Sequence, residues 1–298
     1  MNKLLKFSLL LLIIGLLLTF IALASVGFDI SALEEMTVES FEISESISAV
    51  EISENDLSCD VIIKQHEENF AKLELSYPEK SSMTYTVSDG KLTVKSETEA
   101  NRFFSLFNFK SPTVILYLPT QKYRSVSVKS GSGEILISGI TAKELLVDTI
   151  SGDVEIDNAT VYSTLSISSS SADVSIKNSS TGAFSIDTVS GEIELTDIKA
   201  IKDGKIEATS GDIKMERVTV SSTLTLKSTS GEIEFSHLSA SEIYATTTSA
   251  DVSGTVVGRK NFSTSTSSGD VNIPDSDKDK GIFKIETVSG DIDIEIAD

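Results

Sequence analysis

A tripeptide of Ser, then Gly or Ala, then Asp or Glu recurs at almost constant spacing from residue 132 to the end of the chain. It occurs nine times, and successive copies begin 19 to 21 residues apart. A unit of about 20 residues cannot bury an apolar face alone, so this spacing predicts units that stack on one another. The nine serines are Ser132, Ser151, Ser171, Ser190, Ser210, Ser230, Ser249, Ser268 and Ser289.

Apolar residues lie two positions apart on both sides of each tripeptide. Six and four residues before each Ser, every residue is apolar except Gly204 and Thr264; three and five residues after it, every residue is apolar except Gly254. Alternation of this kind is typical of short strands with one buried face, and Gly or Ala between them permits a bend. The repeats predict an all-β fold, a single-chain parallel β-solenoid with coils of about 20 residues.

The pattern divides the predicted solenoid into two parts. Residues 126–298 form a regular part with the nine repeats, and residues 38–125 form irregular coils of the same solenoid. Within the irregular part, Ser58-Cys59-Asp60 is a degenerate repeat. Cys59 therefore occupies the Gly position, where a small buried thiol is expected, and the single cysteine of the chain has no partner for an internal disulfide.

The N-terminus carries a candidate membrane segment. Lys3 and Lys6 precede an uncharged stretch at residues 7–28, and about 20 apolar residues can cross a bilayer as a helix. Residues 1–28 are therefore predicted to be a signal anchor with a transmembrane helix, and 29–37 a linker. Cleavage as a signal peptide after Ala24 is the alternative. Lysines before the span and acids after it predict a single-pass cell-membrane protein with the solenoid outside the cytoplasm, or a secreted one if the segment is cleaved.

The combination of strands and repeats resembles a known family. The segments that carry the likeness are SAVEISENDLSCDVIIKQ, DGKLTV at 89–94, TVILYLP ending at Pro119, and the SGD/SGE coils. Together they are similar to the bacterial putative-adhesin family of β-strand repeats, a domain of unknown function on cell envelopes. The resemblance covers most of residues 38–298. It implies an extracytoplasmic β-solenoid and assigns no functional residues.

An acidic residue follows the corner of every coil, and two interpretations of this column are open. Stacked on adjacent coils, like charges would lie about 5 Å apart, which is unfavourable unless they are screened or hydrogen-bonded. Each carboxylate could accept a backbone N–H of its turn, as in an Asx-turn, or the column could bind cations or cationic peptides. The residues are Glu134, Asp153, Asp173, Glu192, Asp212, Glu232, Asp251, Asp270 and Asp291.

Three other features have both structural and functional interpretations. One feature has the spacing of a calcium-binding EF-hand loop, with acids at Asp275, Asp277, Asp279 and Glu286. However, Lys280 stands where that loop needs Gly. A solvated loop between coils explains the same residues. The apolar run from Phe103 to Phe109 either caps the solenoid or forms an interface. His66 and His237 lie far apart in sequence, without companions at ligand spacing.

Charge and missing motifs exclude several functional classes. Lys and Arg number 25 against 45 Asp and Glu, a net charge of −20 that opposes nucleic-acid binding. The sequence has no nucleophile elbow, P-loop or HExxH motif, so no enzyme activity, catalytic residue, cofactor or metal site is predicted. The leading interpretation is a membrane-tethered extracytoplasmic interaction scaffold that binds an unknown protein, peptide or envelope polymer. The alternatives are an envelope-stress component that captures cationic peptides and, more remotely, a polysaccharide-processing β-helix enzyme.

Overall fold

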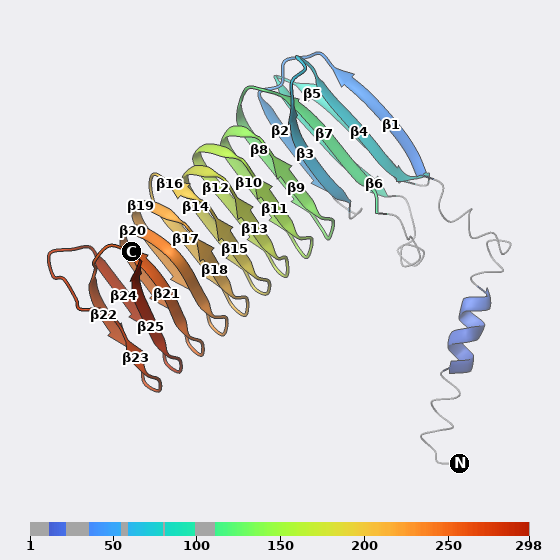
Figure 1. The fold of residues 1–298 in the computed structure, drawn as a ribbon. Helices are drawn as coiled ribbons and strands as arrows, with labels where there is room; N and C mark the ends of the chain where they lie inside the picture. The colour runs from blue at the N-terminus through green and yellow to red at the C-terminus, as the bar shows by residue number, and fades with distance from the viewer. Residues whose placement is uncertain (1–11, 22–35, 55–58, 80, 99–110, 298) are drawn as a thin grey trace, which may run out of the picture.

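The computed structural model describes residues 12–21, 36–54, 59–79, 81–98 and 111–297. It contains a helix at residues 12–21 and a rod of stacked β-strands (Figure 1). No helix in these described ranges is long and apolar enough to cross a membrane. The other residues of the predicted span, 7–11 and 22–28, lie outside the described ranges.

The rod consists of two β-sheets that face each other across the core. Sheet A runs in spatial order through β1 (Met36–Ile43), β4 (Ala71–Pro78), β7 (Thr113–Pro119), β3 (Asp60–His66), β9 (Ile135–Ser138), β11 (Val154–Asp157), β13 (Val174–Lys177), β15 (Ile193–Thr196), β18 (Ile213–Glu216), the first half of β20 (Ile233–Thr246), β21 (Val252–Val257), β25 (Ile292–Ala297) and β23 (Val271–Asn272).

Sheet B contains the other strand of each coil. Its order is β5 (Ser81–Ser88), β6 (Lys91–Thr98), β2 (Ala49–Glu54), β8 (Lys122–Ser130), β10 (Thr141–Thr149), β12 (Thr160–Ser169), β14 (Ser180–Thr188), the collinear pair β16 (Lys199–Ala200) and β17 (Gly204–Ala208), β19 (Thr219–Lys227), the second half of β20, β24 (Ile282–Glu286) and β22 (Asn261–Ser265). The predicted parallel β-solenoid with coils of about 20 residues is therefore confirmed.

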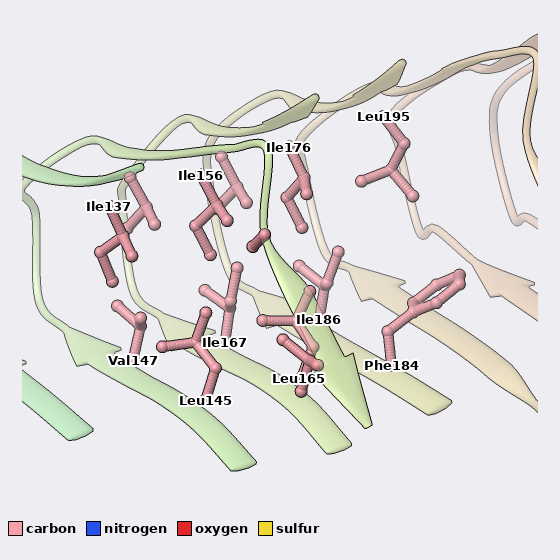
Figure 2. Close-up of a cluster of buried hydrophobic side chains, with 14 of the residues drawn as sticks. Ile137, Leu145, Val147, Ile156, Leu165, Ile167, Ile176, Phe184, Ile186 and Leu195 are labelled. Carbon is pink, nitrogen blue, oxygen red and sulfur yellow. The ribbon is translucent and has the colours of Figure 1, made fainter. Parts of the chain in front are cut away.

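Side chains of the two sheets meet in a continuous core. Residues three and five positions after each repeat Ser point inward from sheet A, and those six and four positions before it point inward from sheet B. Figure 2 shows Ile156 and Ile176 facing Ile167 and Ile186, and all four are almost completely buried. The predicted alternation fails at Val271, which is 44% exposed because it lies in the outermost coil.

The corner glycines are needed because successive coils approach closely, and only at Gly191, with a φ of 141°, is the backbone also in a conformation that favours glycine. A Cβ atom at Gly152 would lie 1.8 Å from the carbonyl oxygen of Gly133, and one at Gly231 would lie 1.9 Å from that of Gly211. Neither glycine has a positive φ. Hydroxyls inside the corner also contribute, since Ser228 Oγ accepts the Gly231 N–H at 2.8 Å. The sequence-based explanation by bending alone was therefore incomplete.

The N-terminal end of the rod mixes two kinds of pairing. Residues 38–125 are predicted as irregular coils of the solenoid, and β2, β3, β6 and β7 do pair in parallel with neighbouring coils. β1, β4 and β5 instead pair antiparallel with their neighbours, an arrangement that the sequence repeats do not predict. These strands form the outer end of both sheets.

The C-terminal end departs from chain order. In a solenoid stacked in chain order each coil would lie on the coil before it, but here β24 lies between β20 and β22, and β25 lies between β21 and β23. The last coil of the chain is therefore inserted between two earlier ones. The coil of β22 and β23 becomes the tip of the rod.

Candidate functional site: the acidic column and the face of sheet A

The acidic column runs along one corner of the rod, and its aspartates bond to the next coil. Asp173 Oδ1 accepts the Glu192 N–H at 2.8 Å, and Asp212 Oδ1 accepts the Glu232 N–H at 2.9 Å. The same bond, at 2.7 to 3.1 Å, joins Asp60 to Glu134, Asp153 to Asp173, Asp251 to Asp291, and Asp291 to Asp270. The partner lies on the adjacent coil and not in the turn itself, so the Asx-turn interpretation is wrong in detail.

Aspartate and glutamate have different roles in this column. Within the described coils, Glu134, Glu192 and Glu232 accept no N–H from the following coil, although each donates its own N–H to the aspartate before it. Aspartates thus connect coils, while the glutamate carboxylates remain available to other partners. Glu192, for example, pairs with Lys214 at 2.6 Å, and this contact raises the pKa of Lys214.

The outer face of sheet A extends this negative charge beyond the column. Glu155, Glu194, Glu234 and Asp293 occupy equivalent outward positions on different coils. The basic residues among the described residues of strands β9 to β25 on this face, Lys177 and Lys214, each lie within ion-pair distance of a glutamate. The face therefore presents an excess of carboxylates.

Sheet B carries a more balanced outer surface. Lys205 contacts both Asp187, at 3.4 Å, and Glu207, at 2.7 Å, and Lys227 contacts Glu207 at 3.1 Å. These contacts lower the pKa of Glu207, chiefly through its hydrogen bond to Lys205. The two faces of the rod consequently differ in their electrostatic character.

A second corner column, which sequence reasoning missed, follows the strands of sheet A. Gly139, Asn158, Asn178, Asp197, Arg217 and His237 all have positive φ. They lie seven residues after the repeat Ser, and the glycine, asparagines and aspartate there were the available signal, since these residues tolerate the left-handed conformation. Arg adopts it less readily, whereas His, like Asn and Asp, is enriched in this conformation.

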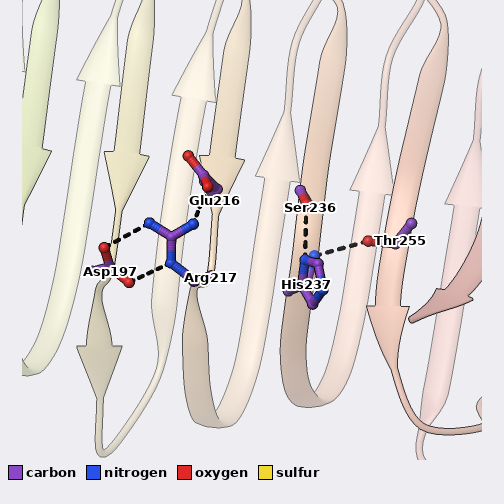
Figure 3. Close-up of polar contacts among 6 residues, drawn as sticks. All are labelled: Asp197, Glu216, Arg217, Ser236, His237 and Thr255. Carbon is purple, nitrogen blue, oxygen red and sulfur yellow. Dashed lines mark hydrogen bonds and ion pairs between the residues drawn. The ribbon is translucent and has the colours of Figure 1, made fainter. Parts of the chain in front are cut away.

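Polar contacts hold the last two members of this column, Arg217 and His237, as Figure 3 shows. Arg217 donates from Nε and Nη2 to the two carboxylate oxygens of Asp197 at 2.6 and 2.7 Å, and also contacts Glu216. The hydrogen bonds to Arg217 lower the pKa of Asp197. His237 Nδ1 lies 2.9 Å from Ser236 Oγ, and its backbone N–H donates to Thr255 Oγ1 at 2.9 Å.

Neither histidine belongs to a group that could hold a metal ion in the described part of the chain. His66 Nε2 lies 2.6 Å from the Phe70 carbonyl oxygen, and its ring packs against Phe70 and Tyr117. His66 lies in β3, far from His237 along the rod. No group of three or more His, Cys, Asp or Glu residues that could hold a metal ion is found in the described ranges.

The loop with calcium-like spacing closes over the tip of the rod. Asp277 donates its N–H to the Lys260 carbonyl at 2.9 Å and accepts the Asp279 N–H at 3.1 Å. Glu286 lies in β24 and pairs with Lys284 at 2.9 Å. Among the described residues, Asp275, Asp277, Asp279 and Glu286 are not gathered into a group that could hold a metal ion, and the loop connects β23 to β24.

Two other predicted features have different outcomes. Cys59 is completely buried at a corner, as the solenoid register predicts. The apolar run from Phe103 to Phe109 lies outside the described residues.

Comparison with known proteins agrees with this architecture. Residues 47–237 and 219–297 match the Toastrack DUF4097 family. The chain belongs to this family. This match confirms the predicted resemblance to a family of β-strand repeats, a domain of unknown function.

Solved structures similar to this Toastrack protein share little sequence with it. A putative adhesin from Bacteroides fragilis has 15% identity and a TM-score of 0.48, and the match covers 88% of this chain and 97% of that one. A protein from Parabacteroides distasonis, described as a putative lipid binding protein, has 16% identity and a TM-score of 0.44 over 88% of this chain and 97% of that one. No curated protein sequence matches the chain.

Proposed function

We propose that this Toastrack protein is a non-enzymatic interaction scaffold, tethered to the cell membrane and exposed outside the cytoplasm. The observation that carries the proposal is the straight alignment of equivalent outward residues along both sheets. Neighbouring strands are about 4.8 Å apart, so sheet A extends for roughly 55 Å. A rod with long, regular faces suits binding to an extended partner along its length.

The N-terminal sequence supports the tether. Lys3 and Lys6 precede the uncharged residues 7–28, and Asp29 and Glu34 follow them. This asymmetry favours lysines on the cytoplasmic side and the rod on the other side. Cleavage after Ala24 would instead release the rod, and the mass of the mature protein distinguishes the two outcomes.

Cysteine labelling in intact cells tests the exposed location. Thr209 is exposed at a corner, whereas Cys59 and Ile213 are completely buried. A membrane-impermeant maleimide should label the Thr209→Cys variant and leave both the wild type and the Ile213→Cys variant unlabelled. Labelling of Thr209→Cys only after the cells are lysed would contradict the proposed topology.

The carboxylate excess on sheet A favours a second candidate function, capture of cationic peptides in the cell envelope. Binding of a Lys-rich peptide should weaken as salt rises, because screening reduces attraction between exposed charges. Neutralising Glu155, Glu194 and Glu234 to Gln should weaken binding severalfold. The matched control neutralises Asp148, Glu242 and Glu286 on sheet B, and an equal loss in both variants would exclude a specific role for sheet A.

A further inference from the structure

The inserted C-terminal coil, residues 282–297, is hydrogen-bonded on both edges. In sheet B, the Thr247 N–H donates to the Glu286 carbonyl and the Thr287 N–H donates to the Ser265 carbonyl, both at 2.9 Å. In sheet A, the Val252 N–H donates to the Asp291 carbonyl, again at 2.9 Å, and Ile292 bonds to Asp270 on the other side. The coil therefore fills a slot between two coils formed by earlier residues.

The slot fits this coil specifically. Phe283 is completely buried, and its ring centroid lies 5.8 Å from that of Phe235 and 5.7 Å from that of Phe262. A Cβ atom at Gly281 would lie 1.8 Å from the Ser241 carbonyl oxygen, and one at Gly290 would lie 2.1 Å from that of Ala250. These glycines let the coil pack directly against the coil of β20 and β21.

The connection to the inserted coil differs from those of the regular coils. In the regular coils a short leading segment, such as Thr219 and Val220 of β19, pairs with the coil before it. Among the described residues, the inserted coil has no such leading segment beside Ala240. The Ala240 carbonyl instead accepts a hydrogen bond from the buried Lys260 side chain. Burial lowers the pKa of Lys260. The loop at residues 273–281 bonds to the rod through Ser276 and Asp277.

We propose that the slot also accepts the C-terminal coil of a second copy of this chain, so that two copies exchange residues 282–297. The strand partners of the coil are β20, β21, β22 and β23, all of which precede it in the chain. A coil from another copy would thus form the same strand bonds, with Gly281 seated beside Ser241 as before. Only the loop at 273–280 would change its path, and it would give up the bonds of Ser276 and Asp277 to its own rod. Rods of equal length tethered to one membrane would hold their tips at the same distance from that membrane, where two tips can meet. This step rests on the proposed function.

Disulfide trapping between full-length copies tests the exchange. Ser253 and Asp293 are paired across β21 and β25. Purified Ser253→Cys and Asp293→Cys proteins, mixed and mildly oxidised, should form a covalent dimer, because exchange places residue 293 of one copy beside residue 253 of the other. The matched control mixes Lys214→Cys with Glu234→Cys, paired across β18 and β20, which residues 282–297 do not reach.

The expected result is roughly tenfold more dimer from the first mixture than from the control. The double variant Ser253→Cys with Asp293→Cys in one chain should form its internal disulfide, which verifies that the coil is seated. Equal dimer in both mixtures, or no dimer while the double variant closes, would overturn the proposal. Either result leaves the proposed scaffold function untouched, because the assay measures neither topology nor partner binding.

Discussion

Asp212 and Glu232 occupy equivalent positions on adjacent coils, but their neutral replacements should have different effects. The Asp212→Asn variant weakens the bond that Asp212 Oδ1 accepts from the Glu232 N–H at 2.9 Å. A hydrogen bond to a charged group contributes about 1.5 to 3 kcal/mol, and a neutral one about 1 kcal/mol. The loss is therefore roughly 1 kcal/mol, before charge repulsion is considered.

Relief of repulsion is the opposing effect, and the structure indicates that it is smaller. Two charges about 5 Å apart in water repel by about 0.8 kcal/mol, and 0.15 M salt reduces this by roughly half. Of the two neighbours of Asp212, Glu192 already pairs with Lys214 at 2.6 Å, so the unpaired repulsion comes mainly from Glu232. Asp212→Asn should consequently destabilise the rod by about 0.5 to 1 kcal/mol.

The Glu232→Gln variant is the matched control, because the Glu232 side chain accepts no N–H from the next coil. It should leave stability unchanged or raise it slightly. Urea unfolding of both variants and the wild type, in 0.05 and 0.5 M NaCl, gives the comparison, and the gap should persist at high salt because a hydrogen bond acts at short range. Equal destabilisation by the two variants, or stabilisation by Asp212→Asn, would refute the reasoning.

Other substitutions test the register, the corners and one buried phenol. Ile213→Asp should cost several kcal/mol because Ile213 is completely buried, whereas the neighbouring Lys214→Gln should be nearly neutral in chemical denaturation; equal losses would contradict the register. Gly231→Ala should cost about 3 kcal/mol by thermal melting, since its Cβ would lie 1.9 Å from the Gly211 carbonyl oxygen, while Ala172→Gly should cost only about 1 kcal/mol. Burial raises the pKa of Tyr123 to about 12 from 10.0, so its contribution to stability is complete below pH 10 and is lost between pH 10 and 12. The stability difference between the wild type and Tyr123→Phe should shrink over that range, and a constant difference in urea midpoints would exclude this linkage.

The regular part of the fold was predictable because one short pattern recurs with both its apolar and its corner positions intact. Ile213 and Ile233 are buried at the predicted offsets because parallel stacking places equivalent residues in register. The acidic column was visible as a pattern, but whether a carboxylate reaches the next coil depends on one methylene group. That distinction between Asp212 and Glu232 required coordinates.

The ends of the rod were not predictable from the repeat. The inserted coil at 282–297 has the same apolar offsets as every other coil, so its sequence fits either an inserted or a sequential position. Gly281 and Lys260 favour the inserted position through contacts with Ser241 and Ala240, and neither contact has a signature in the repeat. The antiparallel strands β1, β4 and β5 precede the regular repeats and lack their markers.

Insertion of the last coil has a mechanical consequence for a rod held at its N-terminus. In a solenoid stacked in chain order, a force on the C-terminus peels away an end coil that is bonded along one edge. Here the same force acts on β25, which is bonded to β21 on one edge and to β23 on the other. Extraction must break both rows of hydrogen bonds and withdraw Phe283 from between two aromatic rings. The end of the chain is therefore more resistant to pulling than an end coil bonded along a single edge would be.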